Sequence, residues 1–280
     1  MIVDSYFEIG SSHEVCQDYT SESLSAVAIS DGCSSNAHSD LGSRILAKNA
    51  ISQISSNNKI IDPKGLIIKS KFIADNLDLS QFDLNATLLT ISASNPKSCK
   101  VQVFGDGVIV ARERNSQDLY VIDISYESGA PFYLQYLLDD KLVEGWKEKY
   151  GPQYTYKTSY VRKDGTIEPI SEMKLDTFKN ELGFEEEFKY KDWDLVTVLS
   201  DGIHSFQEKE VSLIGGKEPI NYLNYLDVIQ ELFKFKLTNG VFIKRRCNKF
   251  FNKHCKSNNW SHYDDFSMGG IYLPEVEDVE

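Results

Sequence analysis

Two apolar runs of this chain end in the same tripeptide. Residues 24–29 (LSAVAI) are followed by Ser30-Asp31-Gly32, and residues 195–199 (LVTVL) by Ser200-Asp201-Gly202. A carboxylate at the end of a buried strand is held rigidly, and the glycine after it permits a sharp turn with an accessible carbonyl. A lone Asp-Gly pair is typical of a turn. Two matched copies after apolar runs indicate that two buried strands each present an aspartate.

Other aspartates occur in similar settings. Asp18 lies in CQDY, Asp106 in FGDGV, and the pair Asp264-Asp265 precedes the last apolar run. Unit charges about 4 Å apart near a surface cost on the order of a few kcal/mol. Carboxylates that meet at one place therefore need cations to neutralise them. Hard divalent ions that prefer oxygen ligands, Mg²⁺ or Mn²⁺, are the natural partners.

The distribution of apolar residues predicts an α+β fold. Strand-like runs occupy 2–9, 24–30, 86–93, 100–104, 107–112, 119–125, 154–161, 194–200 and 267–273. Helices are expected at 39–57, 63–78, 131–149, 218–235 and 239–256. Many strands with a few clustered helices differ from a regular βαβ alternation. No Pro-, Gly- or Ser-rich linker divides residues 1–280, so one domain is expected, with the acidic tail 274–280 frayed.

Charge and cysteine content restrict the class of protein. A net charge of −12 disfavours nucleic-acid binding, and with it a metal-dependent nuclease, because phosphate backbones require a basic surface. Five cysteines, an odd number without a C-x-x-C pair, suggest a reducing compartment. The sequence shows neither a signal peptide nor an apolar run of about 20 residues. We therefore expect a cytoplasmic protein without a membrane partner.

The acidic motifs occur in the order of a known family. They are GSSHEVCQD at 10–18, AISDGCSS at 28–35, DLGS at 40–43, NATL at 85–88, FGDG at 104–107, LSDG at 199–202 and YDDF at 263–266. Together they resemble the PPM-type metal-dependent serine/threonine protein phosphatases (protein phosphatase 2C-like), especially their short bacterial branch. The match extends through almost the whole chain.

The resemblance implies a four-layer α-β-β-α sandwich with two central antiparallel sheets and a dinuclear Mg²⁺ or Mn²⁺ centre at one end. Asp31 matches the aspartate that bridges both ions, and Gly32 the ligand that binds through its carbonyl. Asp18, Asp201 and Asp264 match the other carboxylate positions. Asp31 and Asp201 are thus the expected catalytic residues. A metal-activated water would attack the phosphorus of phosphoserine or phosphothreonine in line.

Several positions depart from the family pattern. His13 stands where eukaryotic members have an arginine that binds the substrate phosphate, a role an imidazolium would fill more weakly; an ordinary structural histidine is the alternative. Gln17 replaces a frequent glutamate, and Cys33 a histidine proposed as general acid. Asp106 matches a ligand of a third, weaker metal, whose usual carboxylate partner four residues after Asp201 is here Ser205.

These departures leave two functions open. The first is an active phosphatase with a phosphorylated protein as substrate, in signalling, with a cognate kinase as a candidate partner. The second is a catalytically impaired phosphatase-like domain that binds a phosphoprotein or ligand and regulates a partner. Retention of the carboxylates favours the enzyme, because a binding module has no need of a costly acidic cluster.

The region 203–262 corresponds to the family's variable helical flap beside the metal centre. It carries a basic stretch from Lys244 to Lys256. Such a run is most often a solvated helix face, and docking of an acidic or phosphorylated partner is the functional alternative. Cys247, His254, Cys255 and His262 fit no standard zinc spacing. Gly215-Gly216-Lys217 lacks the elements of a phosphate-binding loop.

Overall fold

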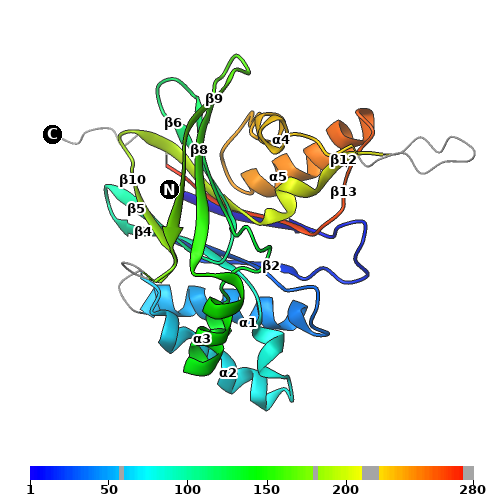
Figure 1. The fold of residues 1–280 in the computed structure, drawn as a ribbon. Helices are drawn as coiled ribbons and strands as arrows, with labels where there is room; N and C mark the ends of the chain where they lie inside the picture. Colours follow the sequence, from blue (N-terminus) through cyan, green and yellow to red (C-terminus); the bar gives the residue numbers. More distant parts are fainter. Residues whose placement is uncertain (57–59, 179–181, 210–220, 274–280) are drawn as a thin grey trace, which may run out of the picture.

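Two antiparallel sheets stack face to face between layers of helices in the computed structural model of the chain (Figure 1). The structure describes residues 1–56, 60–178, 182–209 and 221–273. The expected helix start at 218–220, the glycines at 215–216 and the tail 274–280 lie outside these residues. The predicted α-β-β-α sandwich is confirmed.

The larger sheet has seven strands in the order β1-β14-β11-β6-β7-β8-β9. Their bounds are Ile2–Glu8, Phe266–Tyr272, Trp193–Leu199, Gly107–Glu113, Leu119–Ser125, Gln153–Val161 and Ile167–Asp176. The smaller sheet has five strands in the order β10-β5-β4-β3-β2. Their bounds are Phe184–Lys189, Ser98–Phe104, Leu88–Asn95, Ala26–Asp31 and Asp18–Glu22.

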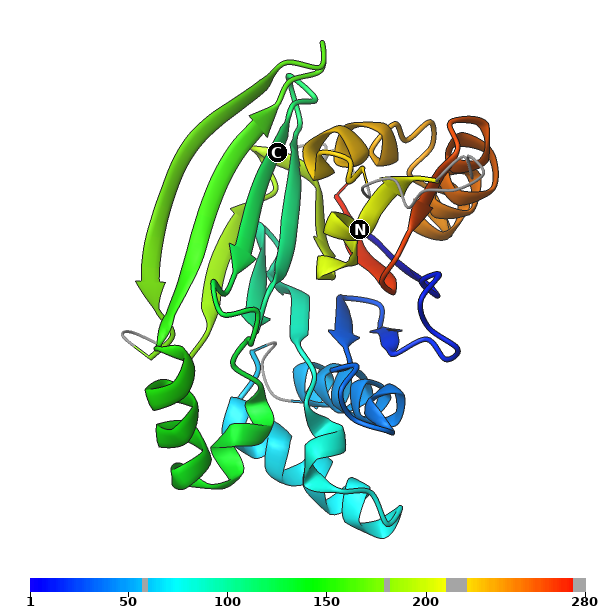
Figure 2. The ribbon, with the colours of Figure 1, turned by 45° about the vertical axis from the view of Figure 1, so that its right-hand side comes forward.

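Helices α1 (Ser39–Ser56) and α2 (Pro63–Asn76) cover the outer face of the smaller sheet. Helices α4 (Tyr225–Leu232) and α5 (Phe242–Lys249) cover the outer face of the larger sheet, as Figure 2 also shows. A short ribbon of β12 (Phe206–Glu208) and β13 (Trp260–His262) joins this helical segment to the sandwich. Helix α3 (Asp140–Tyr150) lies near the lower end of β8.

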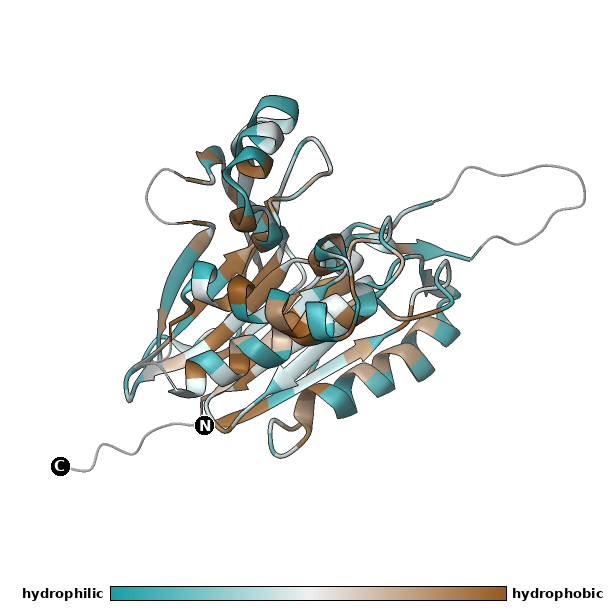
Figure 3. Ribbon diagram, turned by 90° about the horizontal axis from the view of Figure 1, so that it is seen from below, coloured by the Kyte–Doolittle hydropathy of each residue, from teal (hydrophilic) through white to brown (hydrophobic). Residues whose placement is uncertain are grey.

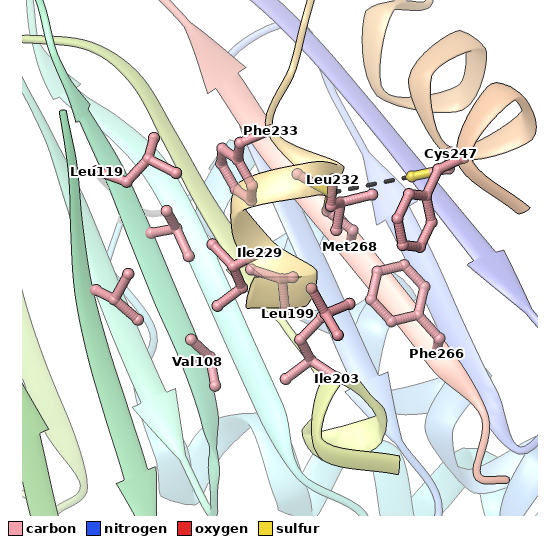
Figure 4. Packing of buried hydrophobic residues seen from close by; sticks show 14 of the residues in the cluster. Val108, Leu119, Leu199, Ile203, Ile229, Leu232, Phe233, Cys247, Phe266 and Met268 are labelled. Carbon is pink, nitrogen blue, oxygen red and sulfur yellow. Dashed lines mark hydrogen bonds between the residues drawn. The ribbon is translucent and has the colours of Figure 1, made fainter. Parts of the chain in front are cut away.

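Three apolar clusters hold the layers together. One fills the space between the sheets, one lies under α1 and α2, and the third lies under α4 and α5. In the third cluster, Ile229 and Leu232 of α4 pack over Val108, Leu199 and Met268 of the sheet (Figure 4). Brown, hydrophobic residues accordingly mark the strands beneath the helices, while teal residues mark outward helix turns (Figure 3).

All nine predicted strands are present, but five further ones were not expected. Three of these, β2, β9 and β10, form edges of the two sheets. Edge strands carry many polar residues because solvent replaces one neighbour, as in FEEEFK of β10. Their sequences therefore lack the apolar signal of the central strands. The short strands β12 and β13 were likewise missed.

Three predicted helices differ from those expected. In the described part of the 218–235 prediction, α4 covers only Tyr225–Leu232, because Asn224 is extended and caps the helix at the Leu226 N–H. The 131–149 helix is a 3₁₀ turn (Leu134–Leu138) followed by α3, because Asp139 is extended and caps the new helix at the Lys141 N–H. The 239–256 helix consists of α5 and a π-helical turn (Phe250–Cys255). Helices α1 and α2 begin where predicted, α2 with Pro63 in its first turn.

Gly42 lets α1 lie directly against the 3₁₀ turn before β4. A Cβ atom at this position would lie 1.7 Å from the carbonyl oxygen of Asp83. We expect Gly42→Ala to lower the free energy of unfolding by about 1–3 kcal/mol, the usual cost of overpacking. Gly145→Ala is the control, since a Cβ in that helix meets nothing within 4 Å and should be neutral or slightly stabilising. Urea unfolding of both variants tests this, and equal stabilities would contradict it.

Candidate metal centre

Strand register places the first two aspartates face to face. Asp18 begins β2 and Asp31 ends β3, and the two residues are direct partners in the antiparallel pair. Like charges directly opposite each other destabilise a sheet. The pairing of β2 with β3 thus places two carboxylates opposite each other, and their repulsion must be offset by hydrogen bonds or cations.

The remaining aspartates follow from the neighbouring strands of the larger sheet. Leu199, the last residue of β11, pairs with Val108 of β6 on one side and Met268 of β14 on the other. Asp201 follows β11 in a 3₁₀ turn (Asp201–Ser205), Asp106 precedes β6 and Asp264 precedes β14. All three therefore lie at the same end of the sheet.

The serines of the two Ser-Asp-Gly motifs fasten this end of the sandwich. The Ser30 hydroxyl donates to the carbonyl of Thr87, whose N–H donates to the carbonyl of Asp31. The Ser200 hydroxyl donates to Asp18 Oδ2 at 2.7 Å and accepts the Ser267 N–H. Because Ser200 follows the larger sheet and Asp18 belongs to the smaller one, the Ser200–Asp18 bond ties the two sheets together.

The glycines of the motifs permit close backbone approach. A Cβ at Gly202 would lie 1.8 Å from the carbonyl oxygen of Asp265, and one at Gly32 would lie 2.6 Å from that of Ser39. Gly202 thus lets the turn after β11 press against the start of β14. Gly32 lets the turn after β3 press against the start of α1.

Burial and neighbouring carboxylates raise the pKa values of several of these aspartates. Burial raises the pKa of Asp31 well above its ordinary value, and the charges of Asp18, Asp201 and Asp264 raise it further. Burial and the charge of Asp201 also raise the pKa values of Asp106 and Asp264. The charge of Asp201 thus acts on Asp31, Asp106 and Asp264, so these predicted carboxylates lie in one region at this end of the sandwich.

Several oxygens in this region are buried without a hydrogen-bond partner among the described residues, including Gln17 Oε1, Asp18 Oδ1 and Asp201 Oδ1. Unpartnered buried oxygens are rare and costly. In the part of the chain that the structure describes, no three His, Cys, Asp or Glu side chains stand close enough to hold a metal ion as they are. The donor set nevertheless consists of oxygens under mutual repulsion, which is the chemistry that fits Mg²⁺ or Mn²⁺.

Asp265 organises the opening motif. Its Oδ1 accepts the Gly10 N–H at 2.7 Å and its Oδ2 accepts the Gln17 N–H at 2.6 Å, so it holds both ends of this loop. His13 lies in between, with Nδ1 2.9 Å from Asp265 Oδ2 and 3.7 Å from Asp264 Oδ1. The His13 ring is thus placed beside the carboxylate cluster, mostly buried, with 18% of its side chain exposed.

Ser205 has a structural role at the position of the family's carboxylate. Its hydroxyl donates to the Gly202 carbonyl at 2.8 Å and accepts the Asp264 N–H at 3.1 Å. It therefore fixes the distance between the turn that carries Asp201 and the loop that carries Asp264.

Sequence reasoning missed two residues near the cluster. Asp123 of β7 is buried, and its charge raises the pKa of Asp106. Tyr133 lies beside Cys33, and burial together with Cys33, Asp106 and Asp31 raises its pKa. The sequence could have indicated only Asp123, because it is a lone acidic residue within the apolar run LYVIDIS. Tyr133 belongs to an irregular segment whose path no pattern predicts.

The dismissed zinc site has no support in the structure. Cys247 is fully buried in the apolar cluster under α5, where its sulfur lies 4.0 Å from that of Met268 (Figure 4). Cys255 belongs to the same cluster. Both cysteines therefore act as small apolar groups.

Comparisons with known proteins agree with this geometry. A family model for protein phosphatase 2C matches residues 9–125, the part that carries Asp18, Asp31 and Asp106. Residues 9–125 are therefore phosphatase 2C-like in sequence. The resemblance drawn from the motifs is confirmed. A comparison with curated proteins found no match.

Solved structures extend the phosphatase 2C-like fold to the whole chain. A bacterial serine phosphatase that carries a point mutation aligns with a TM-score of 0.56 at 11% identity over 99% of both chains. The serine/threonine phosphatase Stp1 from Staphylococcus aureus gives 0.53 at 11% identity over 98% of this chain and 95% of that one. The phosphatase PstP/Ppp of Mycobacterium tuberculosis gives 0.51 at 12% identity over 98% and 99%.

The raised carboxyl pKa values predict how the stability of the metal-free protein depends on pH. Burial raises the pKa of Asp18 from 3.8 to about 7, so the folded chain binds more protons than the unfolded chain between these values. In chelator, the free energy of unfolding should therefore fall as pH rises from about 4 to about 7. Asp18→Asn should flatten this decrease by at least about 1 kcal/mol, measured by urea unfolding at pH 5 and 8. Asp192→Asn, at an exposed position, is the control; a slope unchanged by Asp18→Asn would contradict the assignment.

The position of His13 allows its predicted role to be tested. If the ring binds the substrate phosphate, His13→Ala should raise KM more than it lowers kcat. His13→Arg should retain binding above neutral pH, because arginine stays charged and offers two donors. The measurement is phosphatase kinetics between pH 6 and 9, with the exposed His38→Ala as control. Unchanged KM in both His13 variants would make the residue structural.

Proposed function

We propose that this protein is a metal-dependent phosphoprotein phosphatase that hydrolyses phosphoserine and phosphothreonine. The observation that supports the proposal is that strand register and burial gather Asp18, Asp31, Asp106, Asp201 and Asp264 at one end of the sandwich. A fold needs no such cluster for its stability, because buried like charges oppose folding. Two bound Mg²⁺ or Mn²⁺ ions would remove this cost, acidify a water and neutralise the phosphoryl charge.

The residues divide the work by position. Asp31, which lies opposite Asp18 and feels the charges of Asp201 and Asp264, is the central proposed metal ligand. The carbonyl of Gly32 is a further proposed ligand. Ser200 orients Asp18 by its hydrogen bond, and Asp265 orients the loop that carries His13. Asp106 lies beside Asp201 and the buried Asp123, which makes it the proposed ligand of a third ion.

The surroundings of Cys33 favour an active enzyme over a catalytically impaired domain, although Cys33 replaces the histidine proposed as general acid in the family. Tyr133 adjoins Cys33 and the coupled aspartates, so a phenol occupies the region where the family pattern has a histidine. A catalytically impaired phosphatase-like domain would keep phosphopeptide binding without turnover. The kinetic assay below separates the two functions.

The proposed setting is the cytoplasm, with a phosphorylated protein as substrate and a cognate kinase as a candidate partner in signalling. All five cysteines are free thiols, which supports a reducing compartment. Among the described residues, no helix is long and apolar enough to cross a membrane.

Activity should require added divalent metal and depend on the central aspartates. We expect Asp31→Asn and Asp201→Asn each to lower kcat/KM for an aryl phosphate and a phosphopeptide by about 100-fold or more, comparable with loss of another key transition-state contact. Both variants should remain folded, because they remove a repulsive charge. Mn²⁺ should raise the Tm of the wild type by mass action and that of the variants less. Equal hydrolysis in excess chelator would refute the two-metal proposal, and Asp192→Asn controls for general charge effects.

A further inference from the structure

A cavity of about 380 Å³ lies at the junction of α4 with α5 and its π-helical extension. Its lining contains five basic side chains and one carboxylate, with one histidine and two polar residues. These are Lys234, Lys236, Arg246, Lys249, Lys253, Glu231, His254, Ser257 and Asn258. On a chain of net charge −12, such a concentration of positive charge around a concave site favours an anion.

The basic lining follows from helix geometry. Arg246, Lys249, Lys253 and Ser257 recur at intervals of three or four residues and so share one helix face. The π turn at Phe250–Cys255 adds a local widening of the helix within this face, a feature that often occurs at functional sites. The face therefore presents its charges toward the end of α4 rather than dispersing them.

Two of the basic residues of the 244–256 stretch support the fold instead. Arg246 is 8% exposed, and its guanidinium donates to the Leu232 carbonyl at 2.7 Å and to that of Glu231. It thereby caps the C-terminal end of α4. Arg245 donates to the carbonyls of Leu237 and Asn239. Reversal of these charges would disturb the helical segment and say nothing about binding.

Three lysines of the cavity lining are free to bind an anion. Among the described residues, Lys236, Lys249 and Lys253 form none of the ion pairs or side-chain hydrogen bonds of the structure, whereas Lys234 pairs with Glu231. His254 lines the same cavity, and its Nδ1 lies 3.7 Å from the carboxylate of Glu231. Three unpaired ammonium groups at one concave site offer donors to the oxygens of an anion.

We propose that this cavity binds a phosphate group. Three lysines can surround its oxygens with charge-assisted hydrogen bonds, and the cavity is large enough for a phosphate monoester. The phosphate belongs either to a second phosphorylated residue of the protein substrate or to a free phosphorylated small molecule. The first source rests on the proposed function, whereas the second does not.

The fold sets the distance between the cavity and the carboxylate cluster. The N-terminal end of α4 lies at the cluster side, where Tyr225 packs on His204 with ring centroids 4.3 Å apart. The cavity lies at the other end of α4, about 12 Å away for a helix of this length. A substrate that reached both sites would carry two phosphorylated residues separated by about four positions or more in an extended chain.

The test uses the full-length protein in chelator, with inorganic phosphate as the probe. Trp260 packs against His254 with ring centroids 4.9 Å apart and, labelled with fluorine, reports on the cavity by NMR. Lys249→Glu/Lys253→Glu alters two exposed lining residues. Lys163→Glu/Lys191→Glu makes the same charge change at two exposed lysines outside the lining and is the matched control.

We expect a saturable shift of the Trp260 signal in the wild type and the control, and a Kd at least about tenfold weaker in Lys249→Glu/Lys253→Glu. An equal Kd in that variant, or no saturable shift in the wild type, would overturn the proposal. This measurement needs no turnover, so it stands even if the protein hydrolyses no phosphoester.

Kinetics with metal then identify the source of the phosphate. If the phosphate comes from the substrate, the lining variant should lose about tenfold in kcat/KM for a doubly phosphorylated peptide and keep its activity on the singly phosphorylated one. If both peptides behave alike while inorganic phosphate still binds, the site takes a free phosphorylated molecule.

Discussion

The repulsion among aspartates at one end of the sandwich governs the rest of this structure. Strand register fixes Asp18 opposite Asp31, and neither residue can turn away because both lie within paired strands. The chain compensates in part through the Ser200 hydroxyl, which donates to Asp18 from the other sheet. The remaining unpartnered oxygens of Asp18 and Asp201 mark where positive charge is still required. The cluster thus lowers stability locally, which the proposed cations would offset.

The apolar packing of the sandwich offsets the free-energy cost of the clustered aspartates. Central strands β3 and β11 are almost fully buried, and three apolar clusters hold the four layers. Apolar burial throughout the sandwich stabilises the fold. This stabilisation can offset the repulsion among the aspartates at one end. Ser205 and Asp265 anchor the loops around the site through their hydrogen bonds. At Ser205, a departure from the family pattern thus holds the turn after β11 against the loop before β14.

The helical segment between β12 and β13 carries a concentration of positive charge, in contrast to the acidic end of the sandwich. Its apolar face joins the larger sheet through residues such as Ile229 and Phe242, while its polar face gathers lysines around a cavity. One end of α4 adjoins the acidic cluster and the other end the basic cavity. Under the two proposals made above, the opposite potentials at the two ends of α4 would orient a phosphorylated chain along this side of the molecule.

The sequence by itself determined the central strands, helices α1 and α2, and the identity of the acidic residues. Buried strands such as β3 and β11 carry continuous apolar runs, and motifs such as Ser-Asp-Gly are local, so both can be recognised without a partner. It also indicated, through resemblance, the order of the layers. Edge strands β2, β9 and β10 escaped prediction because their residues face solvent and their pairing is decided by neighbours distant in the chain.

Only the tertiary structure decided which residues meet. The contact of Ser200 with Asp18 joins positions 182 residues apart, and Asp123 and Tyr133 reach the cluster from strands and turns that carry no motif. The same holds for the basic stretch, where folding buries Arg246 as a helix cap and leaves Lys249 and Lys253 exposed at the cavity. The sequence shows which side chains are charged, but packing decides which of them are buried. Burial makes Arg246 a structural residue and leaves Lys249 and Lys253 exposed as the proposed binding residues.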